Sequence, residues 1–358
     1  MKSKFRLVAS ILCVLFLVVL EGCGGTKDKL VDSTYKGQEL SLYIWPEYIP
    51  DDVISDFENS YGVTVNVTTF DSNEEMLAKV QSSSEGTYDI VCPSDYMVKY
   101  MSDNGMLAEI DKDKITNYKN LDDEFLGQYF DEENKYSIPL ASGEIIPCYD
   151  SSVLGDNAIT SLDDLFDKKY KDGLVVLDGM REIIGMTSKS LGYSLNESDD
   201  AKLEKVNEKL QSLKDNIYTM TFAAAHERIL SGEVATGYMF NGNVAQAQLE
   251  NKDIVAVWPK EGSYIWLDNM CILNTSKKQD LASVFINYIL DAKVDAKIRE
   301  EIPSTDPNKA GWELVSDEIK SCDALVIPED QMEKSEYAMD LDDDTLSKYT
   351  EMWTEFTK

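Results

Sequence analysis

The sequence predicts an α/β protein of two lobes with a ligand cleft between them. Three observations support this prediction: strand-like and helix-like segments alternate from Leu40 onward, a second series begins near Tyr149, and an extended segment resumes at Ser263. Alternating strands and helices are typical of sheets covered by helices. The return of the chain at Ser263 closes off the second lobe, and the roughly 320 ordered residues are enough for two separate cores.

The first series is expected to form a parallel sheet with right-handed helical crossovers. Its elements alternate as strand Leu40–Trp45, helix Asp51–Tyr61, strand Val63–Phe70, helix Asp71–Ser83, strand Tyr88–Cys92 and helix Pro93–Gly105. Gly62 is expected to end the first helix, since glycine accepts the left-handed backbone of a C-cap. Ligands bind beyond the carboxyl ends of parallel strands, and four side chains fall there: Trp45, Glu47, Ser94 and Tyr96.

The second series is less regular. Strands are expected at 173–178, 235–240 and 253–258, an extended segment at 263–273, and helices at 181–191, after 241–243, at 279–290, at 293–300 and from Asp344. The segment "SLDD", Ser161 to Asp164, resembles a capping box with Asp at its last position.

Two segments are expected to cross between the lobes as a hinge. Pro139, Gly143 and Pro147 are expected to break regular structure around 140–149, and Pro259 and Gly262 around 259–264. These crossings assign residues 39–143 plus about 264–302 to lobe one, and residues 144–263 plus about 308–358 to lobe two.

The N-terminus is typical of a bacterial lipoprotein precursor. Residues 1–6 hold three cations, and residues 7–20 are 14 uncharged residues, which suits a signal peptide and is short for a membrane span. "LEGC" resembles a lipoprotein cleavage site, although Glu21 is unusual there. We expect a signal peptide over 1–22, lipidation at Cys23 and a flexible tether over 23–38. An ordinary secretory signal and an uncleaved anchor are the alternatives.

The chain is strongly acidic, with a net charge of −32 that becomes −34 without residues 1–22, which carry +2. Such a surface repels nucleic acid and favours cationic partners, although solubility alone also explains it. Four cysteines of the mature chain lack CxxC spacing and predict neither a metal site nor a disulfide framework: Cys92, Cys148, Cys271 and Cys322. No cofactor motif is expected.

Six motifs together resemble the bacterial spermidine/putrescine-binding proteins of ABC importers. They are "YIWPEYIP", "YDIVCPSDYMV", "YSIPLASGEIIPCY", "DGMREIIGMTSKSLGYS", "YMFNGN" and "VWPKEGSYIWLDNMCI". The resemblance runs from about Leu40 to Leu290 and weakens after Ile302. It implies a two-lobed, type II periplasmic-binding-protein fold outside the cytoplasmic membrane. It also implies a polyamine ligand, spermidine or putrescine, delivered to the permease and ATPase subunits of an importer.

The resemblance also implies a set of ligand-binding positions. They fall on Trp45, Glu47, Tyr48, Ser94, Tyr96, Glu182, Phe240, Trp266 and Asp268. The chain departs from the family pattern at other positions, where it has Pro46 for Thr, Gly179 for an acidic residue, Ser304 for Tyr and Ala338 for Gln, and Phe240 itself replaces a Trp. These departures leave the choice between spermidine and putrescine open.

The residue types suit an amine ligand. A buried ammonium group needs a carboxylate or an aromatic face, and its methylene chain needs apolar walls. Trp266 and Asp268 are two residues apart on a strand, so their side chains are expected to share a face. Structural roles remain open: Trp45 could be core, Glu47 solvated on a turn, and Glu182 a favourable acidic residue in a first helical turn.

Other classes of protein are less well matched. The single histidine, His226, lies in an amphipathic segment, and no GxSxG, HExxH or Cys–His pattern indicates an enzyme. A sugar receptor would be expected to add Arg, Asn and His, and an amino-acid receptor needs an Arg, for which Arg181 is the second-lobe candidate. A tethered sensor or adhesin that kept the fold is the remaining alternative.

Overall fold

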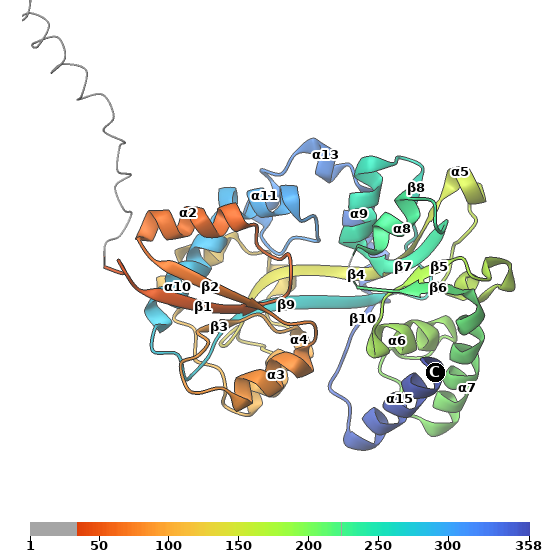
Figure 1. Cartoon of the computed structure of the whole chain (residues 1–358), viewed down its shortest axis with the longest axis horizontal. Helices are drawn as coiled ribbons and strands as arrows, with labels where there is room; N and C mark the ends of the chain where they lie inside the picture. Colours follow the sequence, from red (N-terminus) through yellow and green to blue (C-terminus); the bar gives the residue numbers. More distant parts are fainter. Residues whose placement is uncertain (1–33, 223) are drawn as a thin grey trace, which may run out of the picture.

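The computed structural model describes residues 34–222 and 224–358, which fold into two α/β lobes (Figure 1). One curled sheet runs through both lobes in the order β2-β1-β3-β9-β4-β7-β5-β6, with β10 paired to β9 and β8 to β4. At its centre β4 (Ile138–Asp150) and β9 (Tyr264–Ile272) lie antiparallel and connect the lobes. The predicted two-lobed α/β class is confirmed.

The first lobe follows the predicted order of elements. It contains β1 (Glu39–Ile44), α2 (Asp51–Tyr61), β2 (Thr64–Thr69), α3 (Asn73–Ser82), β3 (Ile90–Val91) and α4 (Asp95–Asp103), and later α10 (Gln279–Ile289), α11 (Ala292–Glu301) and α12 (Lys309–Trp312). β1 pairs in parallel with both β2 and β3, as helical crossovers require. Gly62 ends α2 in the left-handed conformation, as predicted.

The second lobe contains one sheet region and the helices around it. Its elements are α5 (Ser151–Leu154), β5 (Leu174–Val176), α6 (Met180–Ser190), α7 (Asp200–Leu213), β6 (Ile217–Met220), α8 (Ala225–Leu230), β7 (Thr236–Phe240), α9 (Asn241–Glu250), β8 (Ile254–Ala256), α13 (Asp317–Lys320), α14 (Glu329–Met332), β10 (Glu336–Tyr337) and α15 (Asp343–Phe356). β5 pairs in parallel with β6 and β7, whereas β7 is antiparallel to β4. The C-terminal helix α15 packs on α6 and α7 (Figure 1).

The prediction that prolines and glycine break regular structure around 140–149 is wrong. This segment belongs to β4, a 13-residue strand that is buried throughout. Pro139 lies where the pairing of β4 with β9 shifts register. Pro147 lies between Ile145, the last residue of β4 that pairs with β9, and Cys148, the first residue of β4 that pairs with β8. Proline lacks the N–H that a continuous ladder uses, so a bulge and a change of partner are places that tolerate it.

Several second-lobe elements were not predicted, and the predicted capping box is partly formed. Helix α7 and strand β6 occupy segments to which we assigned no element. The "SLDD" segment forms a short 3-10 helix at Asp163–Phe166. Asp164 does accept the backbone N–H of Ser161 at 3.0 Å, which is one half of the capping box.

Each lobe has its own hydrophobic core. In the first lobe Leu40, Leu42 and Ile44 belong to one cluster and Tyr43 to another, so the two faces of β1 are both covered. The second lobe is built around a third cluster that includes residues of β5, β7, α6 and α7. Trp266 packs against cores of both lobes, so this residue lies where the lobes meet.

The predicted signal peptide, Cys23 and most of the tether lie outside the described residues. Of the tether, residues 34–38 are described, and they form a turn held to the first lobe by the backbone N–H of Gly37, which donates to Gly62 O at 2.7 Å. Within residues 34–222 and 224–358, no helix is long and apolar enough to cross a membrane.

Candidate ligand-binding site

A buried carboxylate, Asp268, lies at the centre of the candidate site. Asp268 is on β9 and is 3% exposed. The hydroxyl of Ser94 donates to its Oδ1 at 2.6 Å, and the hydroxyl of Tyr48 donates to its Oδ2. Burial raises the pKa of Asp268 to about 6, although the two hydrogen bonds favour the charged form. Among the described residues, no Lys, Arg or His forms an ion pair with this carboxylate, so it is a candidate partner for a cationic ligand.

The start of α4 positions the hydroxyl groups around Asp268. Ser94 is the N-cap residue of α4, three residues after the end of the short strand β3. Asn73 Nδ2 donates to Ser94 Oγ at 3.1 Å and to the Tyr96 hydroxyl oxygen at 3.2 Å, and Asn73 Oδ1 accepts from Ser94 N at 3.1 Å. The Tyr96 hydroxyl donates to Glu74 at 3.0 Å. Ser94 and Tyr96 are therefore held in one hydrogen-bonded network before any ligand arrives.

Three residues of this network were not predicted: Asn73, Glu74 and Asp95. Asn73 and Asp95 are both buried, at 5% and 1% exposed. Asp95 accepts from Tyr96 N at 2.6 Å and from Leu267 N at 3.1 Å, which ties α4 to β9, and burial raises its pKa to about 8. The sequence did contain a signal for Asn73, because it follows β2 at the same sheet edge as the predicted site residues.

Trp266 and Phe240 form an aromatic wall beside the carboxylate. Their ring centroids are 5.7 Å apart with the rings nearly perpendicular. On β4, Gly143 pairs with Trp266 and Ala141 with Asp268, so the side chains of Trp266 and Asp268 share a face as predicted. A Cβ at Gly143 would lie 2.7 Å from Trp266 Cζ2, so this glycine makes room for the ring. Together they supply the apolar surface that a methylene chain needs.

Trp45 and Glu47 lie apart from the hydrogen bonds to Asp268. The Trp45 ring packs on Phe70 with centroids 4.5 Å apart and borders the core on one face of β1. Glu47 is exposed on the turn after β1 with φ 57°, which is a left-handed conformation. The charge of Glu47 acts on His226 of the second lobe, whose pKa is lowered by burial and raised in part by this carboxylate. Glu47 is therefore near enough to the second lobe for its charge to act on His226.

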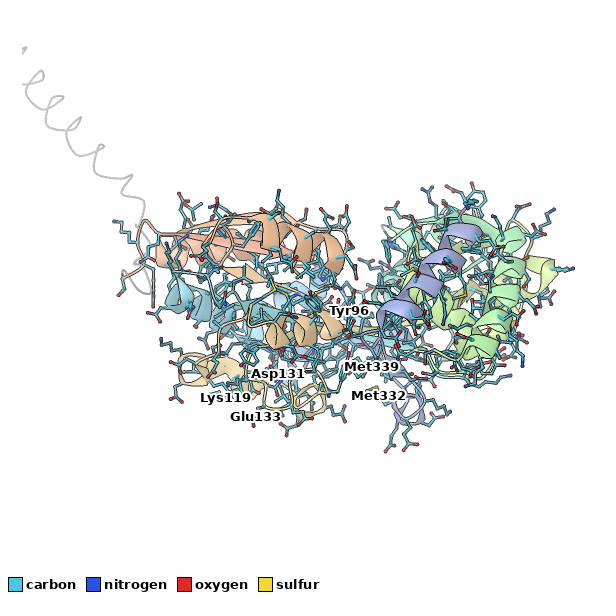
Figure 2. All side chains as sticks on the ribbon, turned by 90° about the horizontal axis from the view of Figure 1, so that it is seen from below. Tyr96, Lys119, Asp131, Glu133, Met332 and Met339 are labelled. Carbon is cyan, nitrogen blue, oxygen red and sulfur yellow. The ribbon has the colours of Figure 1, made fainter. Side chains whose placement is uncertain are left out.

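Glu182 is the second-lobe carboxylate of the site. It lies in the first turn of α6 and is partly exposed. Burial raises its pKa, and its charge in turn raises the pKa values of Tyr96 and Tyr264, so it faces the junction of the lobes. Figure 2 shows Tyr96 between the two lobes. Glu182 makes no ion pair with any described residue, and it is not hydrogen-bonded to the Asp268 group.

Two of the positions that depart from the family pattern, Ser304 and Ala338, make structural contacts. Ser304 Oγ accepts from Arg299 Nη1 at 2.5 Å, and Ala338 O accepts from the Tyr129 hydroxyl at 2.7 Å. Arg181 donates to Asn196 Oδ1 and to Met339 O, both at 3.0 Å. The one arginine considered for an amino-acid ligand is thus held by the second lobe itself.

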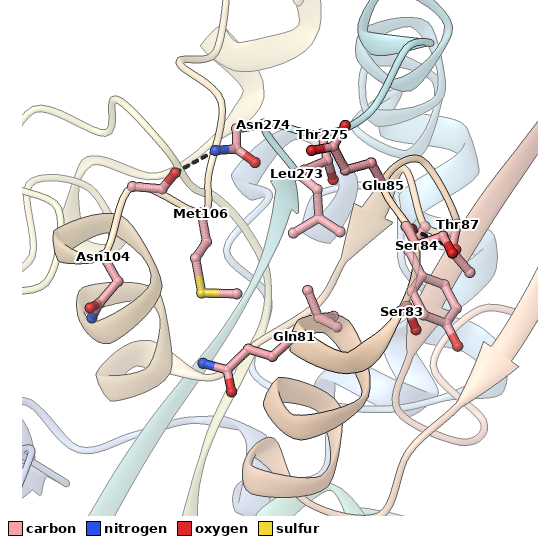
Figure 3. Close-up of a pocket in the computed structure, with 13 residues that line it drawn as sticks. Gln81, Ser83, Ser84, Glu85, Thr87, Asn104, Met106, Leu273, Asn274 and Thr275 are labelled. Atoms are coloured by element: carbon pink, nitrogen blue, oxygen red, sulfur yellow. Dashed lines mark hydrogen bonds between the residues drawn. The ribbon is translucent and has the colours of Figure 1, made fainter.

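A cavity of about 340 Å³ lies on another side of the first lobe (Figure 3). It is lined by Val80, Gln81, Ser83, Ser84, Glu85, Thr87, Tyr88, Asn104, Gly105, Met106, Leu273, Asn274 and Thr275. Leu273 follows Asp268 by five residues along an extended strand, a separation of roughly 16 Å. This cavity is therefore distinct from the carboxylate and aromatic groups described above.

The fold and this site define a two-lobed solute receptor, in which a carboxylate and aromatic rings lie where the lobes meet. A family model described as bacterial extracellular solute-binding protein matches residues 52–312. This chain belongs to that family.

Relatives and solved structures agree with this assignment. The spermidine/putrescine-binding periplasmic protein of Salmonella typhimurium is 34% identical over 85% of this chain and 87% of its own. The spermidine/putrescine ABC transporter substrate-binding protein PotD from Streptococcus pneumoniae is 35% identical, with a TM-score of 0.78, over 90% of this chain and 99% of that chain. A solved structure from Listeria monocytogenes is 34% identical with a TM-score of 0.83, over 89% and 98% of the two chains.

Proposed function

We propose that this protein captures a linear polyamine outside the cytoplasmic membrane and delivers it to an ABC importer. The observation that carries the proposal is Asp268, a 3%-exposed carboxylate with two hydroxyl donors and no cationic partner among the described residues. A desolvated carboxylate is costly unless a cation neutralises it. An ammonium group of the ligand supplies that charge, and the Trp266 ring beside it supplies a cation–π face and an apolar wall.

The relatives support the same ligand class. All three of the named proteins carry spermidine and putrescine in their descriptions. The ligand-contacting residues we propose are Trp45, Glu47, Tyr48, Ser94, Tyr96, Glu182, Phe240, Trp266 and Asp268. An amino-acid ligand is less well supported, since Arg181 is already engaged by Asn196 and Met339.

The lobes are proposed to close on the ligand. We assign residues 39–143 plus about 264–302 to the first lobe and 144–263 plus about 308–358 to the second, except that α12 packs on α11 of the first lobe. Movement would be centred where β4 and β9 pass between them. Small-angle scattering should show a more compact particle with ligand, and unchanged profiles at saturating ligand would contradict closure.

The protein is further proposed to be anchored by a lipid on Cys23 after removal of residues 1–22. The permease and ATPase subunits of the importer would then receive ligand at the membrane surface. Replacing Cys23 by Ala should release the protein from membranes in a fractionation experiment. Full retention of the variant on membranes would argue for an uncleaved anchor instead.

The proposed ligand class is tested by calorimetric titration of the mature protein. Putrescine, spermidine and spermine are expected to release heat and saturate at one site, whereas lysine and maltose are not. Tight binding of lysine or maltose, with no heat from any amine, would overturn the proposal.

A further inference from the structure

An exposed aromatic ring extends the site into the second lobe. Phe222 lies after β6 and is 41% exposed. Its ring stacks on Phe240 with centroids 6.3 Å apart and planes 19° apart. Phe240 in turn meets Trp266. Three rings therefore form a row that starts at Trp266 and ends at the exposed face of Phe222.

A carboxylate lies at each end of this row. Asp268 is beside Trp266 on the same face of β9. At the other end, a Cβ placed on Gly179 would be 2.0 Å from Glu182 Oε2 and 2.9 Å from Phe222 Cζ. Glu182 and Phe222 therefore pack side by side over Gly179, which has no side chain to keep them apart.

The length of the row favours one kind of polyamine. The ring centroids are separated by steps of 5.7 and 6.3 Å, so the row is at most 12 Å long. At about 1.25 Å per bond, a four-carbon diamine spans roughly 6 Å between its nitrogens, whereas a triamine such as spermidine spans roughly 11 Å. A diamine covers one step of the row, and a triamine covers both.

We propose that Phe222 is a specificity-determining residue that makes the site fit a triamine better than a diamine. This inference rests on the proposed polyamine function. One terminal ammonium pairs with Asp268, the methylene groups lie along Trp266 and Phe240, and the far ammonium reaches Glu182 where Phe222 covers it from water. Covering a charge pair strengthens it, because the surrounding dielectric falls. A four-carbon diamine held at Asp268 does not reach Phe222.

The test compares spermidine with putrescine by calorimetric titration of the wild type and two alanine variants. The wild type should bind spermidine at least about tenfold more tightly than putrescine. Phe222→Ala should weaken spermidine binding by about tenfold and putrescine binding by less than about twofold. The matched control is Tyr218→Ala, four residues earlier on β6 and 50% exposed, which should leave both affinities unchanged.

Two more variants keep the test decisive if Phe222→Ala is poorly folded. Phe222→Tyr retains the ring and should keep more of the selectivity than Phe222→Ala. Gly179→Ala should displace both Glu182 and Phe222 and lower the spermidine to putrescine ratio. If Phe222→Ala weakens both amines equally, or neither, the inference is wrong while polyamine binding stands. If the wild type binds no amine, the proposed function itself is wrong.

Discussion

The two lobes contribute to the site in different ways. On the first-lobe side, Asp268, Ser94 and Tyr48 are joined by direct hydrogen bonds, and Asn73 and Asp95 fix the start of α4. On the second-lobe side, the contacts are ring against ring, and the carboxylate of Glu182 has no ion-pair partner among described residues. One half of the site is preorganised, and the other half is partly open to solvent.

This difference indicates how binding would proceed. Groups that are already hydrogen-bonded lose little conformational entropy when the ligand arrives, so the first lobe is suited to capture one ammonium group. The second lobe gains most from closure, because its exposed ring and carboxylate become desolvated only then. Variants on the two sides should therefore differ in size of effect and in sensitivity to solvent conditions.

The largest effect is expected for Asp268→Asn on the preorganised side. The amide keeps the shape and can still bond to hydroxyls, but it removes the charge that faces the ligand ammonium. Breaking a desolvated charge pair costs about 2–4 kcal/mol of binding free energy. Titration with spermidine measures this, and circular dichroism should show an unchanged fold. An affinity within about threefold of the wild type would mean that the ammonium binds elsewhere.

The junction between the two sides is tested by Gly143→Ala. The added Cβ would lie 2.3 Å from Asn241 Oδ1 and 2.7 Å from Trp266 Cζ2, so the ring shared by both lobes must move. Overpacking of this kind costs about 1–3 kcal/mol of unfolding free energy. Denaturant unfolding of the ligand-free protein measures this cost, and polyamine affinity should fall with it. If Gly143→Ala kept both the stability and the polyamine affinity of the wild type, the Trp266 ring would not need this space.

The sequence predicted the first-lobe side better than the second, for physical reasons. Elements β1 to α4 are short and local, so alternation and capping residues were enough to find them. The prolines and glycine of β4 led us to predict a break in regular structure. This prediction was wrong because the bulge at Pro139 and the change of partner near Pro147 are set by strands far away in the chain. Helix α7 could have been found, since its buried residues Leu203, Val206, Leu210 and Leu213 have helical spacing.

The site shows the same contrast between local and long-range information. Motifs in the sequence pointed to Asp268 and Ser94, and the structure brings them together. Phe222 could not be recognised, because its place beside Phe240 and Glu182 depends on how β6, β7 and α6 come together. Asp95 lay between two predicted site residues, yet only its burial reveals that it holds α4 to β9.

The preorganised side should also make binding depend on pH. The pKa of Asp268 is raised by burial to about 6 from its ordinary 3.8, so the free protein takes up a proton at this group as the pH falls below 6. The ammonium ligand needs the ionised form. Affinity should therefore be full at pH 7.5 and fall by about tenfold at pH 5.

The same group changes stability with the opposite sign. Because its folded pKa lies above the unfolded value, the ligand-free protein loses stability from Asp268 as the pH rises from about 4 to 6, and ligand offsets this loss above pH 6. Titrations at pH 5, 6 and 7.5 check the affinity, with Asp268→Asn as the control that subtracts other titrating groups. A wild-type affinity that is flat over this range would contradict the assignment.

The smallest effect is expected for Glu182→Gln on the open side. Its carboxylate is partly exposed and Asp268 is buried, so Glu182 should be less fully desolvated in the complex, and the loss should be about 1 kcal/mol. Asp178→Asn, which changes an exposed acidic residue four positions earlier, is the matched control and should have no effect.

The dependence of binding on salt should distinguish the two sides of the site. Raising the ionic strength from about 0.05 to 0.5 M should shrink the difference between wild type and Glu182→Gln, because salt screens a less buried charge more strongly than a buried one. The difference between wild type and Asp268→Asn should persist, because that carboxylate is buried. Equal salt dependence for both variants would mean that the two lobes do not differ in the way their geometry indicates.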